Sequence, residues 1–158
     1  MLAFFKPGRF IRAFPWVLCA FLWLLTALQY AYLPAQIPTH FNFSGKADGY
    51  GSRNSIWILP LLLSIFLGIF SFLIHSYRKK QSLHDGNSSV TPKFHLLIRL
   101  LQLLSVSLGC LFLFLGIQTI RESKGMPVLS GALFVIIVQG LIWVPMAYFF
   151  YHYLKMKR

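Results

Sequence analysis

The sequence predicts an all-α fold, a four-helix transmembrane bundle with a structured extracytoplasmic loop between its first two helices. Of the 158 residues, 57% are hydrophobic and only 11% are charged, whereas a soluble domain carries about a quarter charged residues. The apolar residues form four long blocks, and a block of about 20 residues spans a bilayer. Nearly all Lys and Arg flank these blocks. We therefore interpret residues 1–158 as a single integral membrane domain.

Each apolar block predicts one membrane span. The first covers about 14–33 and is expected to be an uncleaved signal anchor, because its apolar run is longer than that of a signal peptide. The second covers about 55–77 and the third about 94–120. The fourth, about 127–153, ends in an aromatic belt of the kind found at headgroup level.

The basic residues predict the orientation of the four spans. Eleven of them flank one side of the predicted membrane region and four flank the other. The side richer in Lys and Arg is cytoplasmic as a rule. The termini and the loop 78–93 are therefore expected to be cytoplasmic, and the loop 34–54 to face outward. Anionic lipids on the cytoplasmic side are the expected lipid partners of these bases.

The net charge of +12 raises the question of nucleic-acid binding. The sequence holds no basic stripe with interleaved aromatic residues on a soluble surface, which argues against a nucleic-acid partner. No Asp, Glu or Lys lies deep in a predicted span. Ion-driven transporters normally need such groups, so their absence disfavours that class. The sequence also indicates no cofactor.

Amides and small residues inside the spans predict how the helices associate. Gln29, Gln118 and Gln139 lie within predicted spans, and buried amides in membranes usually bond between helices. Small residues that allow close helix approach occur in the last three spans: Gly68, Gly109, Gly116 and Gly140. Packing within the bundle and a homo-oligomer interface both use such residues, and the sequence does not separate them.

The outer loop contains an alternating segment after Pro38. In an extended strand, alternation sends Phe41 and Phe43 to one face and His40 and Asn42 to the other. The phenyl rings are expected to anchor the segment in the membrane or the bundle. The polar side chains are then available for structure or for a partner.

Turn chemistry follows in the same loop, which predicts that it is compact. Gly45, Gly49 and Gly51 permit positive φ or close backbone approach, and Asp48-Gly49 is a strong turn signal. Arg53 is expected to pair with Asp48, and Ser52 or Asn54 to cap the second helix.

Chemistry at this loop depends on very few residues. His40 and Asp48 are candidate metal ligands, but zinc usually has three or four protein ligands and calcium several carboxylates. We therefore predict no metal site. The sequence shows neither a nucleophile elbow around Ser44 nor an evident catalytic group, which favours a protein that is not an enzyme.

The segment "LPAQIPTHFNFSGKADGYGSR" between two apolar blocks resembles a bacterial membrane domain of unknown function. Its signature is a Leu-Pro-x-x-Ile-Pro-x-His-Phe-Asn-x-x-Gly-x-x-Asp loop, and the resemblance covers about residues 32–75. The domain also forms the N-terminal part of SdpI-type immunity proteins, which protect bacilli from a secreted peptide toxin. The resemblance implies a multi-pass protein of the bacterial cytoplasmic membrane.

Three functions remain open from the sequence. The outer loop binds or senses a peptide, a lipid or a partner protein. Alternatively, it carries a metal-dependent activity, or the chain is an accessory subunit of a transporter or membrane complex.

Overall fold

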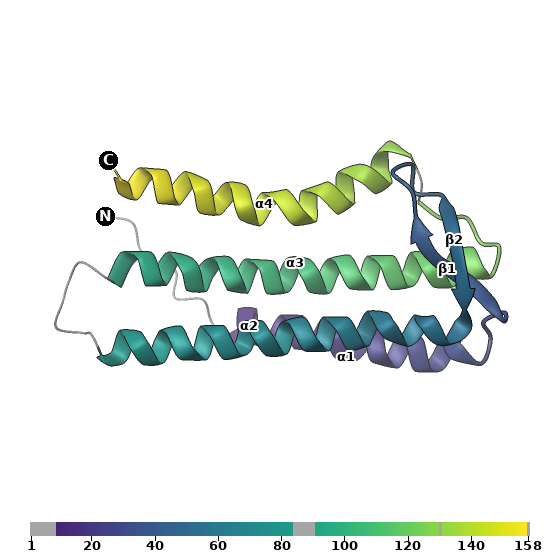
Figure 1. Cartoon of the computed structure of the whole chain (residues 1–158), viewed down its shortest axis with the longest axis horizontal. Coiled ribbons are helices and arrows are strands. Elements are labelled where there is room, and N and C mark those ends of the chain that lie inside the picture. Colours follow the sequence, from purple (N-terminus) through teal and green to yellow (C-terminus); the bar gives the residue numbers. More distant parts are fainter. Residues whose placement is uncertain (1–8, 84–90, 130, 158) are drawn as a thin grey trace.

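The structure is a computed structural model that describes residues 9–83, 91–129 and 131–157. The described part contains four long helices and a β-hairpin (Figure 1). The helices are α1 (Arg9–Tyr30), α2 (Ile58–Leu83), α3 (Thr91–Ser123) and α4 (Ala132–Lys157). All four are long and apolar enough to cross a membrane. The predicted fold class is confirmed.

The helix ends differ from the predicted span limits. All four helices extend at their basic ends beyond the apolar blocks, since Lys and Arg are good helix formers and continue the backbone bonding. α4 begins at Ala132 instead of 127, after Pro127 and Gly131, whose φ is +69°. Of the predicted loop 78–93, residues 84–90 lie outside the described residues, as do Lys6 and Arg158.

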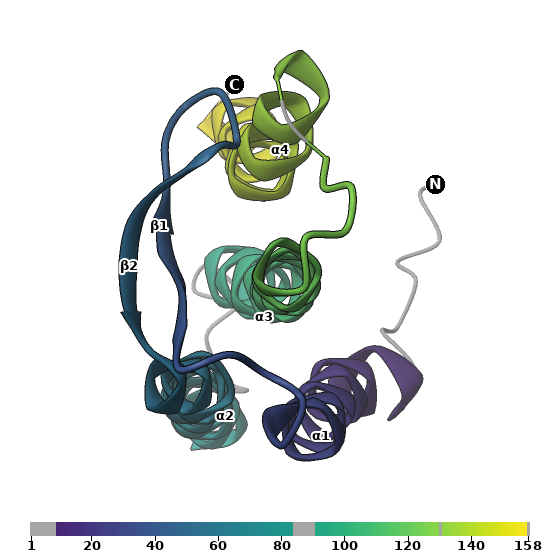
Figure 2. The same ribbon diagram turned by 90° about the vertical axis from the view of Figure 1, so that its right-hand side faces the viewer.

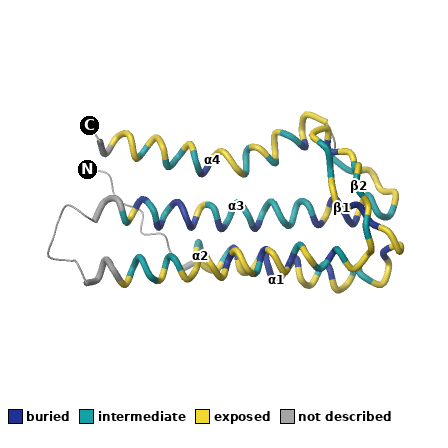
Figure 3. The backbone as a smooth tube through the Cα atoms, in the orientation of Figure 1, coloured by how far each residue is buried: buried dark blue, intermediate teal, exposed yellow. Residues whose placement is uncertain are grey.

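Helix α3 lies at the centre of the arrangement. Viewed along the bundle, α1 and α2 lie on one side of α3 and α4 lies on the other, while the hairpin arches from the α2 side to α4 (Figure 2). Burial follows this order, because α3 carries many of the buried residues and α4 is largely exposed (Figure 3). The hairpin therefore gives α4 a second connection to the bundle, besides its packing on α3.

Two buried clusters form the core. One lies between the spans and contains Cys19, Leu22, Leu63 and Leu67. The other lies beneath the hairpin and contains Leu33, Ile37, Ile56 and Ile120. The second cluster joins the hairpin to α3, so the loop is packed onto the bundle.

Glycines on α3 explain how closely α1 approaches it. A Cβ added at Gly109 would lie 2.9 Å from Leu18 Cδ1, and one added at Gly116 would lie 2.7 Å from Leu22 Cδ1. The predicted close-approach role of these two glycines is confirmed. A Cβ at Gly68 or Gly140 would meet no described atom within 4 Å, so these two do not pack the described chain.

The hairpin consists of β1 (Gln36–Phe41) and β2 (Ala47–Ser52), and the short 3₁₀ helix η1 (Arg53–Trp57) leads into α2. Ser52 caps η1, as its hydroxyl accepts a hydrogen bond from the Asn54 backbone N–H. Proline at position 38 fits this sheet because Pro38 lies opposite Tyr50, at a position where an N–H would point away from β2. Its missing donor therefore costs no bond between the strands.

Candidate functional site

Asn42 organises the turn of the hairpin. Its Oδ1 accepts hydrogen bonds from the backbone N–H groups of Ser44 and Lys46, at 2.9 and 3.1 Å. Its own backbone N–H donates to Lys46 O, and its carbonyl accepts from the Gly45 N–H. This is the local side-chain bonding that favours Asn in turns. Asn42 is thus a structural residue here, and its amide oxygen is already engaged.

Gly45 places the turn against α4. Its φ is +71°, and a Cβ added there would lie 2.6 Å from Phe134 Cγ. The Gly131 N–H donates to Ser44 O at 2.5 Å, which fixes the start of α4 to the same turn. Phe41 packs against the same side chain, with its ring centroid 6.0 Å from that of Phe134. The hairpin tip therefore holds the first turn of α4.

The expected turn at Asp48-Gly49 is wrong, because both residues lie within β2. Gly49 and Gly51 have no positive φ, and close cross-strand packing is what requires glycine there. A Cβ at Gly49 would lie 3.0 Å from His40 Cβ, and one at Gly51 would lie 2.9 Å from Thr39 Cγ2. The turn forms instead around Asn42, where the local bonding is denser.

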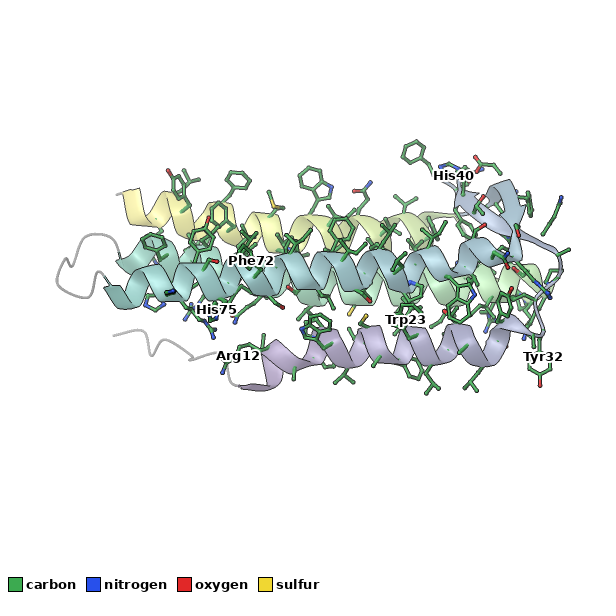
Figure 4. The ribbon with its side chains drawn as sticks, turned by 60° about the horizontal axis from the view of Figure 1, so that its bottom comes forward. Arg12, Trp23, Tyr32, His40, Phe72 and His75 are labelled. Carbon is green, nitrogen blue, oxygen red and sulfur yellow. The ribbon has the colours of Figure 1, made fainter. Side chains whose placement is uncertain are left out.

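His40 and Asp48 form an ion-pair geometry across the strands. His40 Nδ1 lies 2.5 Å from Asp48 Oδ1, and the two side chains are 70% and 44% exposed. Because a carboxylate only accepts, Nδ1 donates and the outer ring nitrogen Nε2 is left for another partner. His40 lies at the outer border of the hairpin (Figure 4). Within the described residues, no group of three or more His, Cys, Asp or Glu side chains gathers to hold a metal.

The expected pairing of Arg53 with Asp48 is wrong, because the two residues lie in different surroundings. The Arg53 guanidinium lies 5.1 Å from the ring centroid of Tyr30. The Tyr30 hydroxyl donates to Asn54 Oδ1 at 2.5 Å, and its ring lies 5.5 Å from that of Trp57. Arg53 therefore fixes the base of the hairpin to α1, away from the His40–Asp48 pair at the tip.

Phe41 and Phe43 differ in their surroundings. β1 ends at Phe41, with register irregularities on either side of His40, so the predicted alternation does not continue to Phe43. Phe43 lies in the turn and is 88% exposed. Phe41 packs on the protein, and the anchoring of Phe43 in a membrane stays a prediction.

The three span amides have three different environments. Gln29 Oε1 accepts from Lys124 Nζ at 2.5 Å, which joins the end of α1 to the loop after α3. Buried Gln118 bonds Leu129 twice, since its Nε2 donates to Leu129 O at 2.6 Å and its Oε1 accepts from Leu129 N at 3.2 Å. Gln139 is exposed and accepts from Trp143 Nε1 at 2.8 Å, so this bond stays within α4.

Several residues of this region were not singled out from the sequence. Phe134 contacts Phe41 and Lys124 bonds Gln29, in each case from more than 90 residues away along the chain, so only the tertiary fold brings these partners together. Tyr30 lies just before the loop and Trp57 just after it, and the two rings contact each other. Aromatic residues at both ends of a loop are typical of a membrane interface, so the sequence could have indicated this pair.

Comparison with known proteins supports the resemblance at the level of a domain. Residues 17–63 match the family DUF1648, a domain of unknown function. This match runs from α1 through the hairpin and into α2. An uncharacterized protein of Archaeoglobus fulgidus is 40% identical over 58 residues, which cover 37% of this chain and 32% of that protein. The chain thus spans about a third of the length of that relative, and no solved structure matches.

Proposed function

We propose that the chain is a multi-pass membrane protein whose hairpin faces the outside of the cell and binds an extended peptide by strand addition at β2. The observation that carries this proposal is the exposed edge of a two-stranded sheet that is fixed rigidly to its bundle. β1 lies between β2 and α3, and β2 is the outer strand (Figure 2). An exposed strand edge offers unpaired N–H and C=O groups to an added strand.

The register indicates which groups of β2 face outward. The Arg53 N–H donates to Ala35 O, which makes that pair a hydrogen-bonded one. In an antiparallel ladder such pairs alternate with non-bonded pairs, so the Tyr50 and Ser52 N–H groups point away from β1. Gly49 and Gly51 lie beside them and present no side chain that would keep a second backbone away.

The exposed side chains around this edge favour a peptide that has both polar and aromatic residues. His40 and Asp48 supply one oriented, hydrogen-bonded pair, while Tyr50 and Phe43 are 61% and 88% exposed. The imidazole of His40 is paired with the carboxylate of Asp48 and not with a hydroxyl, which favours recognition over nucleophilic catalysis as the role of the pair. The resemblance to SdpI-type immunity proteins supports the same partner class, a secreted peptide.

The test uses the full chain in lipid nanodiscs and a phage library of displayed 8-residue peptides as the probe. We expect enriched peptides to protect the Tyr50 and Ser52 amides from hydrogen exchange. Tyr50→Pro removes an outward N–H and should weaken binding at least tenfold, while Tyr50→Ala keeps that N–H and should lose less. Enriched peptides that leave these amides unprotected, or that bind Tyr50→Pro equally well, contradict the proposal.

A further inference from the structure

We propose that a cavity between α1, α2 and α3, at the end of the bundle where α1 begins and α4 ends, binds the phosphate of an anionic phospholipid headgroup. This site lies at the opposite end from the hairpin and does not depend on the function proposed there. It is a partly open pocket that three helices line together, and so differs from the general attraction of surface bases to anionic lipids.

The cavity has a volume of about 250 Å³, many times the roughly 10–15 Å³ that holds one water. Its polar lining comes from all three helices, with Arg12 on α1, His75 and Arg78 on α2, and Gln102 on α3. Figure 4 shows Arg12 and His75 at the same end of the bundle, on neighbouring helices. A single anion in the cavity is therefore within reach of groups from three helices.

The two guanidinium groups give this cavity its charge. Arg12 and Arg78 are close enough to interact electrostatically, and two like charges at one site favour an anion between them. The described carboxylates, Asp48 and Glu122, lie at the hairpin end of the molecule. Asp85 lies outside the described residues. Guanidinium groups match a phosphate particularly well because they bond two of its oxygens at once.

Gln102 provides an independent indication of a ligand. Its side chain is 3% exposed and lines the cavity. Among the buried side-chain nitrogens and oxygens that the structure describes, Gln102 Nε2 is the atom without a hydrogen-bond partner. A buried donor without a partner costs about 1–3 kcal/mol, and a phosphate oxygen in the cavity would accept from it.

The shape of the cavity favours a lipid phosphate over a soluble one. Arg78 and Leu67 both line it, and they are eleven residues apart on α2, which is about 16 Å along the helix. The charged groups lie toward the helix ends, and the lining that extends into the membrane-spanning stretches is uncharged, with apolar Pro15, Trp16 and Leu67 beside Ser71 and Ser105. A headgroup followed by acyl chain has this same order of polarity.

The test measures binding to the full-length, delipidated protein by native mass spectrometry, with dioleoyl phosphatidylglycerol as the probe. We expect it to bind at least tenfold more tightly than dioleoyl phosphatidylcholine, and millimolar inorganic phosphate not to displace it. Arg12→Gln and Arg78→Gln should each weaken binding about tenfold, and Gln102→Leu by a smaller factor. Lys79→Gln removes the same charge from an exposed residue next to Arg78 and should change binding less than twofold.

Each alternative outcome overturns a definite part of the proposal. Equal losses for Lys79→Gln and Arg78→Gln would show diffuse surface attraction, and tight binding of inorganic phosphate would show that the ligand is not a lipid.

A second measurement needs no arginine variant. Brominated phosphatidylglycerol should quench the fluorescence of the native protein more than brominated phosphatidylcholine does, and Trp16→Phe should remove that excess. Equal quenching by the two lipids contradicts the site.

Discussion

Gly45 in the hairpin turn and Phe134 on the first turn of α4 are in direct contact, and no side chain larger than hydrogen fits between them. The Phe134 ring also contacts Phe114 of α3, with 5.7 Å between centroids. The contact therefore holds the hairpin, α3 and α4 together at one point. It is one of the few places where α4 meets a part of the described chain other than α3.

Gly45→Ala should destabilise the protein by roughly 2 kcal/mol or more, because the added Cβ meets the Phe134 ring and an L residue at φ +71° is strained. The measurement is unfolding by SDS in mixed micelles. Gly68→Ala is the matched control, since its Cβ meets nothing and alanine favours a helix. An equal loss in both variants would mean that the contact has no special role.

Gln118→Leu should cost about 1–3 kcal/mol, because it leaves both polar groups of the Leu129 backbone without their partner. Faster hydrogen exchange at the Leu129 amide should accompany the loss. Gln139→Leu makes the same change at an exposed residue that bonds its own helix, and its effect should stay within about 0.5 kcal/mol. If the two variants behave alike, the Gln118 bridge does not stabilise the connection between α3 and α4.

The sequence allowed the four helices to be predicted, because the thickness and apolar interior of a bilayer set the length and hydropathy of each span. It did not allow us to predict which side of α4 packs against the bundle and which side is exposed. This helix is apolar on all sides, so nothing in its pattern shows that Gln139 points outward while Gln118 on α3 is buried. The facing of both amides depends on which neighbours pack against them, and that is set by the tertiary structure.

The hairpin was predicted as a compact loop, but its turn was placed at the wrong residues. Two local signals compete there, Asp48-Gly49 and the segment Asn42–Gly45, and the second prevails because Asn42 bonds four backbone groups. That choice moves Asp48 into β2, opposite β1, where it meets His40 instead of Arg53. The pairing depends on a bulged register, which no spacing rule in the sequence gives.

His40→Gln and Asp48→Asn should each change the free energy of unfolding by less than about 1 kcal/mol, because the pair is solvent-exposed and screened. A double-mutant cycle in mixed micelles measures their coupling directly. Both variants should nevertheless weaken the binding of peptides selected on the native hairpin. A coupling well above 1 kcal/mol would instead assign the pair a structural role, and unchanged peptide binding would remove it from the proposed recognition surface.

The orientation of the bundle can be tested with single cysteines in a chain whose two free native cysteines, Cys19 and Cys110, are replaced by alanine. Phe43→Cys lies on the exposed turn of the hairpin, and Lys155→Cys lies exposed near the end of α4. The excess of Lys and Arg at the α4 end predicts that this end is cytoplasmic. A membrane-impermeant maleimide should therefore label Phe43→Cys on intact cells and label Lys155→Cys only after permeabilisation. The reverse pattern would place the hairpin inside the cell, where a secreted peptide does not reach it.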